Sequence, residues 1–169
     1  MSLGGKKVFL FTLLAIISVF LYSVPPFRFK AKPFLDLLSH GFFAGIFFFL
    51  LPFFFFNQKM DNEILWLSFL TFYIFVLLEI RNHLEDYEFD KKAGLKTTVC
   101  FLGKEKSEKM LSFLILIFPL FVFPLFFKKG IFLNFYIFSS LYSFGSFLKV
   151  QKIIVFLIFT LHSFLFSFY

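Results

Sequence analysis

Two aspartates four residues apart are the clearest candidates for chemistry in this chain. Asp86 and Asp90 stand in a polar stretch between two long apolar segments. If the helix before them continues past Ile80, both carboxylates lie on one helical face about one turn apart, and Asn82 lies on the same stripe. Two carboxylates that point into a cavity form a hard-oxygen site. Mg²⁺ prefers such a site, completed by waters and substrate phosphates.

Lysines and a glycine follow the aspartate pair. Gly94 is expected to end the helix, and Lys91, Lys92 and Lys96 could neutralise a polyphosphate. The alternative is an ordinary solvated loop, because acids and bases are balanced over residues 79–109. On its own, a D-x-x-x-D pattern in a hydrophilic loop is weak evidence for a metal site.

A second polar segment, residues 22–33, is rich in proline and in basic residues. Pro25 and Pro26 are expected to end one helix, since neither can donate a backbone hydrogen bond. Pro33 suits the first turn of the next helix. Between these prolines stand three cations that alternate with apolar residues: Arg28, Lys30 and Lys32. They form either a positively charged stop at a membrane face or contacts for an anionic ligand.

Membrane-spanning helices are the elements that must position these residues. Of the 169 residues, 60% are hydrophobic, 16% are charged and 36 are Phe. A soluble domain is about 45–50% apolar and about 25% charged. The composition therefore excludes a disordered tail and a nucleic-acid module, and it predicts an integral membrane protein. The single cysteine, Cys100, excludes an internal disulfide framework.

Long apolar segments define the expected architecture. A spanning helix needs about 20 mostly apolar residues. Six segments meet this requirement: about 8–24, 34–56, 63–80, 110–127, 131–148 and 153–169. The predicted fold is all-α, a polytopic transmembrane helix bundle of about six spans that forms one domain over residues 1–169.

The basic residues are distributed unevenly over the loops between these spans. Most of the 17 Lys and Arg residues fall in the first, third and fifth loops. Because short cytoplasmic loops carry the excess of positive charge, these loops are expected to face the cytoplasm and both termini the outside. The same bias accounts for the net charge of +7 without a nucleic-acid partner.

Together, the two polar segments resemble those of the UbiA-type intramembrane prenyltransferases. The family pattern Y-S-x-P-P-x-R-x-K is matched at Tyr22, Ser23, Pro25, Pro26, Arg28 and Lys30. The pattern D-x-x-x-D-x-x-x-G-x-x-T is matched at Asp86, Asp90, Gly94 and Thr97. The similarity covers nearly the whole chain, and the motifs stand in the family's order.

The resemblance implies a fold and an activity. Family members are nine-helix bundles that transfer an isoprenoid chain from a prenyl diphosphate to an aromatic or lipid acceptor. Two aspartate-rich motifs hold Mg²⁺ on the diphosphate, and nearby cations assist the departure of pyrophosphate. The expected location is the bilayer of a bacterial or archaeal plasma membrane, with the motif loops on the cytoplasmic side.

The resemblance also assigns roles by position. Asp86 and Asp90 would be Mg²⁺ ligands, and with Arg28 and Lys30 they would be the catalytic residues. The candidate substrate-binding residues are Tyr22, Ser23, Asn82, Arg81 and Lys91. His83 is expected either to support this site or to be an ordinary interfacial histidine with its hydrogen bonds satisfied.

Three further polar residues receive no catalytic role. His40 and His162 lie inside apolar spans and are expected to hydrogen-bond to a neighbouring helix. Glu79 is expected to pair with Arg81 or Lys109.

The family's first aspartate-rich motif, N-D-x-x-D-x-x-x-D, does not occur in this sequence. Asp36 is the only acid before Asp61, so the chain resembles the later two-thirds of a family member, about six of nine helices. Half of a two-motif site should bind Mg²⁺–diphosphate poorly, because the two halves act together. The favoured expectation is a truncated gene product or a misplaced start. The alternatives are half of a split enzyme, with a second chain supplying the other helices, and a non-catalytic protein that kept the scaffold.

Functions of other classes stay open. A transporter or a lipid-binding protein would also gather polar residues at one face of a small bundle, and a structural membrane subunit needs no site at all. Transport would be supported by ionisable residues at mid-span and by interrupted helices. Here the charges stand at helix ends, which argues against transport.

Overall fold

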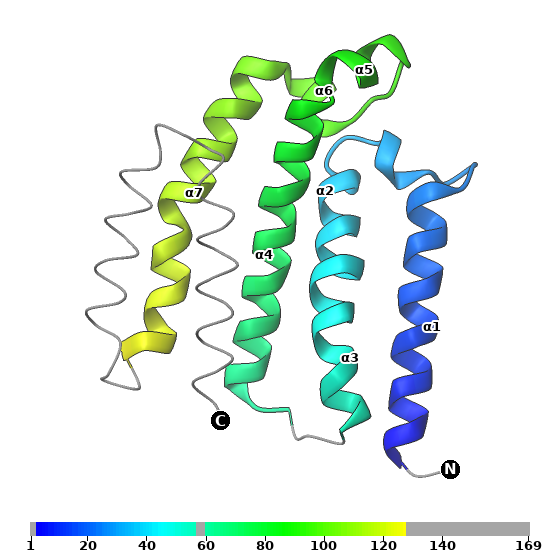
Figure 1. Ribbon diagram of the computed structural model, residues 1–169, viewed down its shortest axis with the longest axis vertical. Helices are drawn as coiled ribbons and strands as arrows, with labels where there is room; N and C mark the ends of the chain where they lie inside the picture. Colours follow the sequence, from blue (N-terminus) through cyan, green and yellow to red (C-terminus); the bar gives the residue numbers. More distant parts are fainter. Residues whose placement is uncertain (1–2, 57–59, 128–169) are drawn as a thin grey trace. The chain divides into compact units, whose positions relative to one another are not determined.

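The computed structural model describes residues 3–56 and 60–127, and these residues form helices with no strand among them (Figure 1). The elements in chain order are α1 (Leu3–Ser23), the 3₁₀ turn η1 (Phe29–Ala31), α2 (Leu35–His40), the π-helical segment η2 (Gly41–Phe47), α3 (Phe48–Phe55), α4 (Asn62–Glu85), α5 (Tyr87–Lys92), α6 (Thr98–Leu102) and α7 (Lys104–Phe127). The contacts divide the chain into two units, residues 1–108 and 109–169. The residues considered for function lie in the first unit. The predicted all-α fold is confirmed.

Three helices of the described residues are long and apolar enough to cross a membrane: Gly5–Ser23, Leu35–Phe55 and Asn62–Glu85. They coincide with the first three predicted spans. Helix α7 covers the fourth predicted segment, whereas the fifth and sixth lie outside the described residues. The total of about six spans stays a prediction.

Helix α1 carries a wide apolar surface. Phe9 and Ile16 expose 64% and 61% of their surface, while Phe11 packs against Phe47 and Phe54 on the neighbouring helix. Such a surface would be unfavourable in water. It suits lipid, where a helix satisfies its backbone hydrogen bonds internally.

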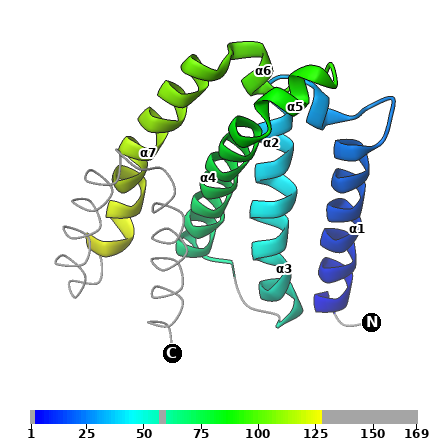
Figure 2. The same ribbon diagram turned by 45° about the horizontal axis from the view of Figure 1, so that its top comes forward.

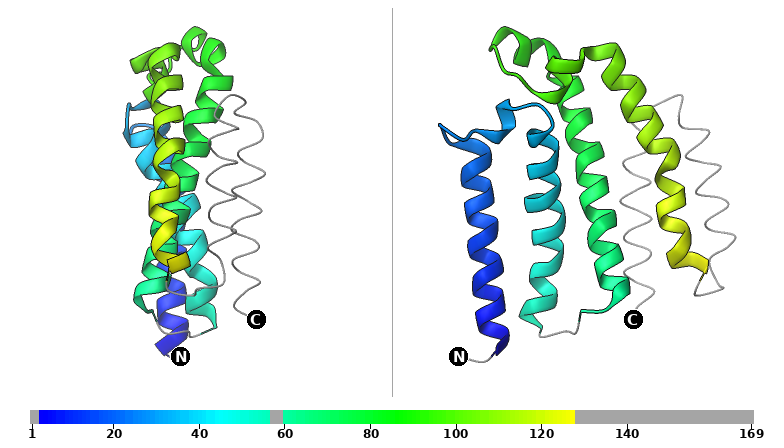
Figure 3. Two further views of the ribbon diagram at one scale, coloured as in Figure 1. Left: turned by 90° about the vertical axis from the view of Figure 1, so that its left-hand side faces the viewer. Right: turned by 180° about the vertical axis from the view of Figure 1, so that it is seen from behind.

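The second spanning helix contains the π-helical segment η2, which packs closely on α4 (Figure 3). A Cβ atom added at Gly45 would lie 2.8 Å from the Cα atom of Phe72, and one added at Gly41 would lie 2.7 Å from the Phe72 ring. Small residues allow the backbones of membrane helices to approach closely. The two glycines are therefore what permits this contact.

Helix α4 forms the centre of the first unit. Its N-terminus is capped by Asp61, whose side chain accepts a hydrogen bond of 2.8 Å from the N–H of Ile64. The helix continues to Glu85, about one turn beyond the predicted end of the third span. Its inward face supplies five of the nine buried apolar residues described in the first unit: Leu67, Leu70, Ile74, Leu77 and Ile80.

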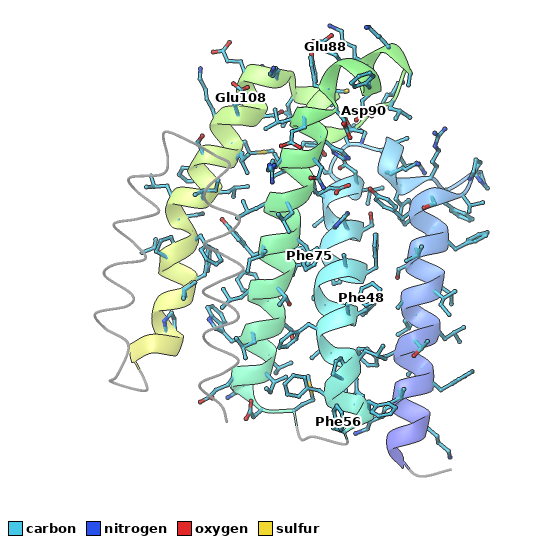
Figure 4. The ribbon with its side chains drawn as sticks, in the orientation of Figure 1. Phe48, Phe56, Phe75, Glu88, Asp90 and Glu108 are labelled. Carbon is cyan, nitrogen blue, oxygen red and sulfur yellow. The ribbon has the colours of Figure 1, made fainter. Side chains whose placement is uncertain are left out.

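The short elements gather at one end of these helices. Turn η1 contacts α1 and α2, while α5 and α6 contact α4 and each other (Figure 2). Figure 4 shows Asp90 at this end and Phe56 at the opposite end. Both polar segments predicted from the sequence therefore lie at one end of the first unit.

Candidate functional site

The aspartate pair lies where α4 gives way to α5. Asp86 is the C-cap residue of α4, with φ −90° and ψ 5°, so the long helix does not continue through the pair as the sequence suggested. The four-residue spacing nevertheless survives, because the N–H of Asp90 donates to the carbonyl of Asp86 at 2.9 Å and the N–H of Asp86 to that of Asn82 at 2.9 Å. Gly94, at φ +67°, ends this segment as predicted.

The two carboxylates differ in their surroundings. Asp86 is exposed and Asp90 is half-buried, and Figure 4 shows Glu88 farther out than Asp90. Burial raises the pKa of Asp90, as do the charges of Asp86 and Glu79, while His83 and Lys30 act in the opposite direction. A bound cation would relieve this accumulation of negative charge.

In the basic loop, residues 22–33, Lys30 is the cation that influences the aspartate pair. This lysine lies in η1 and is close enough to Asp90 to affect its ionisation. Arg28 is exposed and has a left-handed backbone, with φ 34°. Lys32 lies over the ring of Phe29, 5.5 Å from its centroid. Lys30 therefore lies within electrostatic range of the acidic segment, residues 86–96, whereas Arg28 lies at the surface.

Several predicted substrate-binding residues have other surroundings. Arg81 pairs with Glu85 at 2.6 Å, and Lys91 lies over the ring of Tyr87, 5.7 Å from its centroid. Asn82 and Ser23 are exposed. The expected pairing of Arg81 with Glu79 is wrong, because residues two apart on a helix do not face each other whereas residues four apart do.

Glu79 is the centre of a buried polar cluster. Its carboxylate accepts a hydrogen bond of 2.5 Å from the hydroxyl of Tyr22 on α1. It lies 2.8 Å from Nδ1 of His40 on α2 and 3.2 Å from Nε2 of His83 on α4. His40 therefore pairs with a carboxylate on a neighbouring helix, whereas His162 lies outside the described residues. The cluster ties together three spanning helices just inside the polar end.

A second buried carboxylate, Asp36, continues the cluster. Asp36 is fully buried and accepts hydrogen bonds from the N–H of Thr98 at 2.6 Å and from its hydroxyl at 2.5 Å. The N–H of Leu37 donates a third, at 2.8 Å. Nδ1 of His83 lies 3.4 Å from Asp36, so His83 bridges the two buried acids.

These buried acids were missed by reasoning from the sequence. In the sequence, Asp36 stands as an isolated acid, and the spacing of Glu79 indicates no role. A signal was present, because an acid within an apolar span is costly and marks a functional or structural contact. Its partner Thr98 carried no comparable signal.

The donor set suits a hard divalent cation only in part. Among the residues described, no group of three or more His, Cys, Asp or Glu side chains is arranged to hold a metal ion. Asp86 and Asp90 supply two carboxylates. Mg²⁺ commonly binds through one or two carboxylates and completes its shell with waters and substrate phosphates. The pair fits that use and does not form a complete protein cage.

Comparison with known proteins identifies the family. A family profile described as "UbiA prenyltransferase family" matches residues 2–165. A solved UbiA homologue from Archaeoglobus fulgidus bound to DMAPP and Mg²⁺ matches with a TM-score of 0.69 and 28% identity, over 87% of this chain and 50% of that one. A structure titled as a homologue from that organism, bound to GPP and Mg²⁺, matches with a TM-score of 0.66 and 27% identity, over 90% and 60%.

A further structure of a homologue from A. fulgidus, bound to Cd²⁺, is 30% identical, with a TM-score of 0.66 over 88% of this chain and 53% of that one. No curated protein matched. The chain spans between 50% and 60% of the length of these solved relatives. Because the profile covers almost the entire sequence and the helices superpose on these relatives, the chain belongs to the UbiA prenyltransferase family.

Proposed function

We propose that this chain forms part of a prenyltransferase that moves an isoprenoid chain from a prenyl diphosphate to an aromatic or lipid acceptor. The single observation that carries the proposal is that the aspartate pair and the basic loop lie at the same end of the first unit (Figure 2). Carboxylates that hold a divalent cation and a lysine beside them form a receptor for a diphosphate. The family relatives bound to DMAPP or GPP with Mg²⁺ support this assignment.

Each part of the site has a distinct task in this proposal. Asp86 and Asp90 would hold Mg²⁺, which when bound polarises the bond between the prenyl carbon and the diphosphate oxygen. Lys30 would stabilise the charge on the departing pyrophosphate. The prenyl carbon forms its new bond to the acceptor, and the acceptor loses a proton.

Aromatic side chains lie farther along the helices from this end. Tyr22 and Phe43 have ring centroids 5.1 Å apart, and Phe75 stacks on His40 at 5.9 Å. Figure 4 shows Phe75 partway along α4. Aromatic faces attract cations, so this group is suited to an allylic tail that carries positive charge. We assign the activity to the complete bundle of a family member, because this chain spans between 50% and 60% of the length of the solved relatives.

The test is to replace each aspartate by asparagine and measure Mg²⁺-dependent prenyl transfer in the full-length or reconstituted protein. Asp86→Asn and Asp90→Asn should each lower the rate about 100-fold or more, as expected when a preorganised electrostatic contact is lost. Glu88→Gln removes an exposed acid of the same helix α5 and should leave the rate unchanged. Undiminished transfer by both aspartate variants would remove the metal-site assignment.

A further inference from the structure

One buried hydroxyl joins the two polar loops. Oγ1 of Thr98 accepts a hydrogen bond of 2.6 Å from the N–H of Phe34, where the basic loop ends. The same oxygen donates to Asp36 at 2.5 Å. Thr98 also follows the acidic segment, residues 86–96, by two positions. A single side chain therefore contacts the end of one loop directly and stands at the end of the other.

The backbone of Phe34 needs this support. Phe34 has φ 66° and ψ −34°, a region that residues with bulky side chains rarely occupy. Such conformations persist where the surrounding contacts hold them. The bond from the Phe34 N–H to Thr98 supplies one contact, and the Phe34 ring lies edge-on to Phe101, with 6.0 Å between centroids.

Asp36 holds Thr98 in place. The side chain of Asp36 is fully buried, and each of its oxygens accepts from a different donor group of Thr98, one from the hydroxyl and one from the N–H. A buried carboxylate is costly unless it is hydrogen-bonded. Helix α2 therefore tolerates this acid because Thr98 and the Leu37 N–H satisfy it.

We propose that Asp36 and Thr98 are positioning residues that hold the acidic segment against the basic loop, so that Asp90 and Lys30 face one diphosphate. The inference rests on the function proposed above, and it adds two residues that touch neither metal nor substrate. It explains why the buried carboxylate of Asp36 accepts two hydrogen bonds from a residue 62 positions away in the sequence.

Thr98→Val removes the hydroxyl while nearly keeping the shape of the side chain, and Thr98→Ser keeps the hydroxyl. We would measure two properties of the full chain in lipid nanodiscs: amide exchange, and calorimetric binding of inorganic pyrophosphate with Mg²⁺. Thr98→Val should speed exchange at Phe34 and over residues 86–96. It should weaken pyrophosphate binding about 10- to 100-fold, the usual effect of losing a residue that orients metal ligands. Thr98→Ser keeps the hydroxyl and should show the exchange rates and the pyrophosphate affinity of the wild type.

Thr97→Val is the matched control. Thr97 is also buried, and its hydroxyl caps α6 by accepting from the N–H of Cys100 at 3.3 Å. Its replacement weakens the helix start and leaves the bonds to Asp36 and Phe34 in place. Pyrophosphate affinity should therefore stay at the wild-type value. If Thr98→Val does not fold, Asp36→Asn, which keeps the shape of the carboxylate, undergoes the same two measurements.

Unchanged exchange at Phe34 in the Thr98→Val protein would overturn the inference, and so would wild-type pyrophosphate affinity in that variant. Undiminished prenyl transfer by Asp86→Asn and Asp90→Asn in the full-length or reconstituted protein would refute the proposed function instead. If the wild-type chain on its own binds no Mg²⁺–pyrophosphate, the exchange measurement decides whether Asp36 and Thr98 couple the loops.

Discussion

Acidic residues at the polar end fall into two kinds. Asp36 and Glu79 are buried and each meets several hydrogen-bond donors. Asp86 is exposed, and the carboxyl of Asp90 has a raised pKa because burial and neighbouring negative charges disfavour its ionised form. The buried pair stabilises the packing of helices. Asp86 and Asp90 leave their carboxylates able to bind a ligand, and this lowers the stability of the fold, as is common at functional sites.

This cost can be measured by removing the charge of Asp90. Its pKa is raised in the folded chain, so the folded state binds more protons, and stability falls as the pH rises from the ordinary value of an aspartate through the raised value. Ionised Asp90 therefore lowers the free energy of unfolding at pH values above its pKa. Asp90→Asn should stabilise the metal-free protein by about 0.2–0.5 kcal/mol, the cost of like charges one turn apart, or about 1 °C in Tm.

Thermal unfolding in detergent with and without Mg²⁺ tests this expectation. The ion should raise the Tm of the wild type, because a ligand that binds only the folded state stabilises it. It should leave the Tm of Asp90→Asn unchanged. Glu88→Gln, on the exposed side of α5, should respond to Mg²⁺ like the wild type. A lower metal-free Tm for Asp90→Asn would show that this carboxylate stabilises the fold.

The spacing of residues explains what could be predicted at this scale. The separation of Asp86 and Asp90 is local, and a backbone hydrogen bond between them persists across the bend between α4 and α5. Their joint role at a metal site stays a prediction. The contact between Asp36 and Thr98 joins positions 62 residues apart. No periodicity encodes such a contact, since it depends on how the helices pack.

The second spanning helix is the element that brings His40 to Glu79. Segment η2 begins immediately after His40 and rests against α4 through two glycines. Its span was predictable from hydropathy, because its apolar run is long and lacks charge. Its π-helical form was not predictable, since composition is the same for an α-helix and a π-helix.

The contact at Gly45 gives a test of this packing. Gly45→Ala places a methyl group 2.8 Å from the Cα atom of Phe72, so the helices must separate. The expected loss is about 1–3 kcal/mol, typical of an overpacked interior. Unfolding of the reconstituted chain by denaturant measures it.

Phe48→Ala on α3 is the matched control. Phe48 is 60% exposed and is directed away from the packed interior, so its loss should change the free energy of unfolding by no more than about 0.5 kcal/mol. Equal stability of Gly45→Ala and the wild type would mean that the close approach is not required.

At the scale of the molecule, both polar loops lie at one end of the first three spans. The distribution of Lys and Arg predicts that this end faces the cytoplasm. The family match and the apolar helices agree with a membrane location. If the proposed function holds, a prenyl diphosphate in the cytoplasm would then reach the proposed site without crossing the bilayer.

Single cysteines in place of Lys30 and Lys92 test the orientation. In a Cys100→Ser background, a membrane-impermeant thiol reagent should label both positions only from the cytoplasmic side. A cysteine at Met60, near the other end of α4, should be labelled only from the outside. Labelling of Lys30→Cys from outside would reverse the predicted topology.

The π-helical turn after His40 also bears on how related sequences should differ. A π-helical segment accommodates one residue more than an α-helix over the same length of axis. Deleting one residue within Gly41–Phe47 would restore an α-helix and rotate the preceding turn by about 100° relative to the following one. His40 would then turn away from Glu79. We therefore expect the extra residue and the histidine to be inherited together, so that an alignment gap here coincides with a change at position 40.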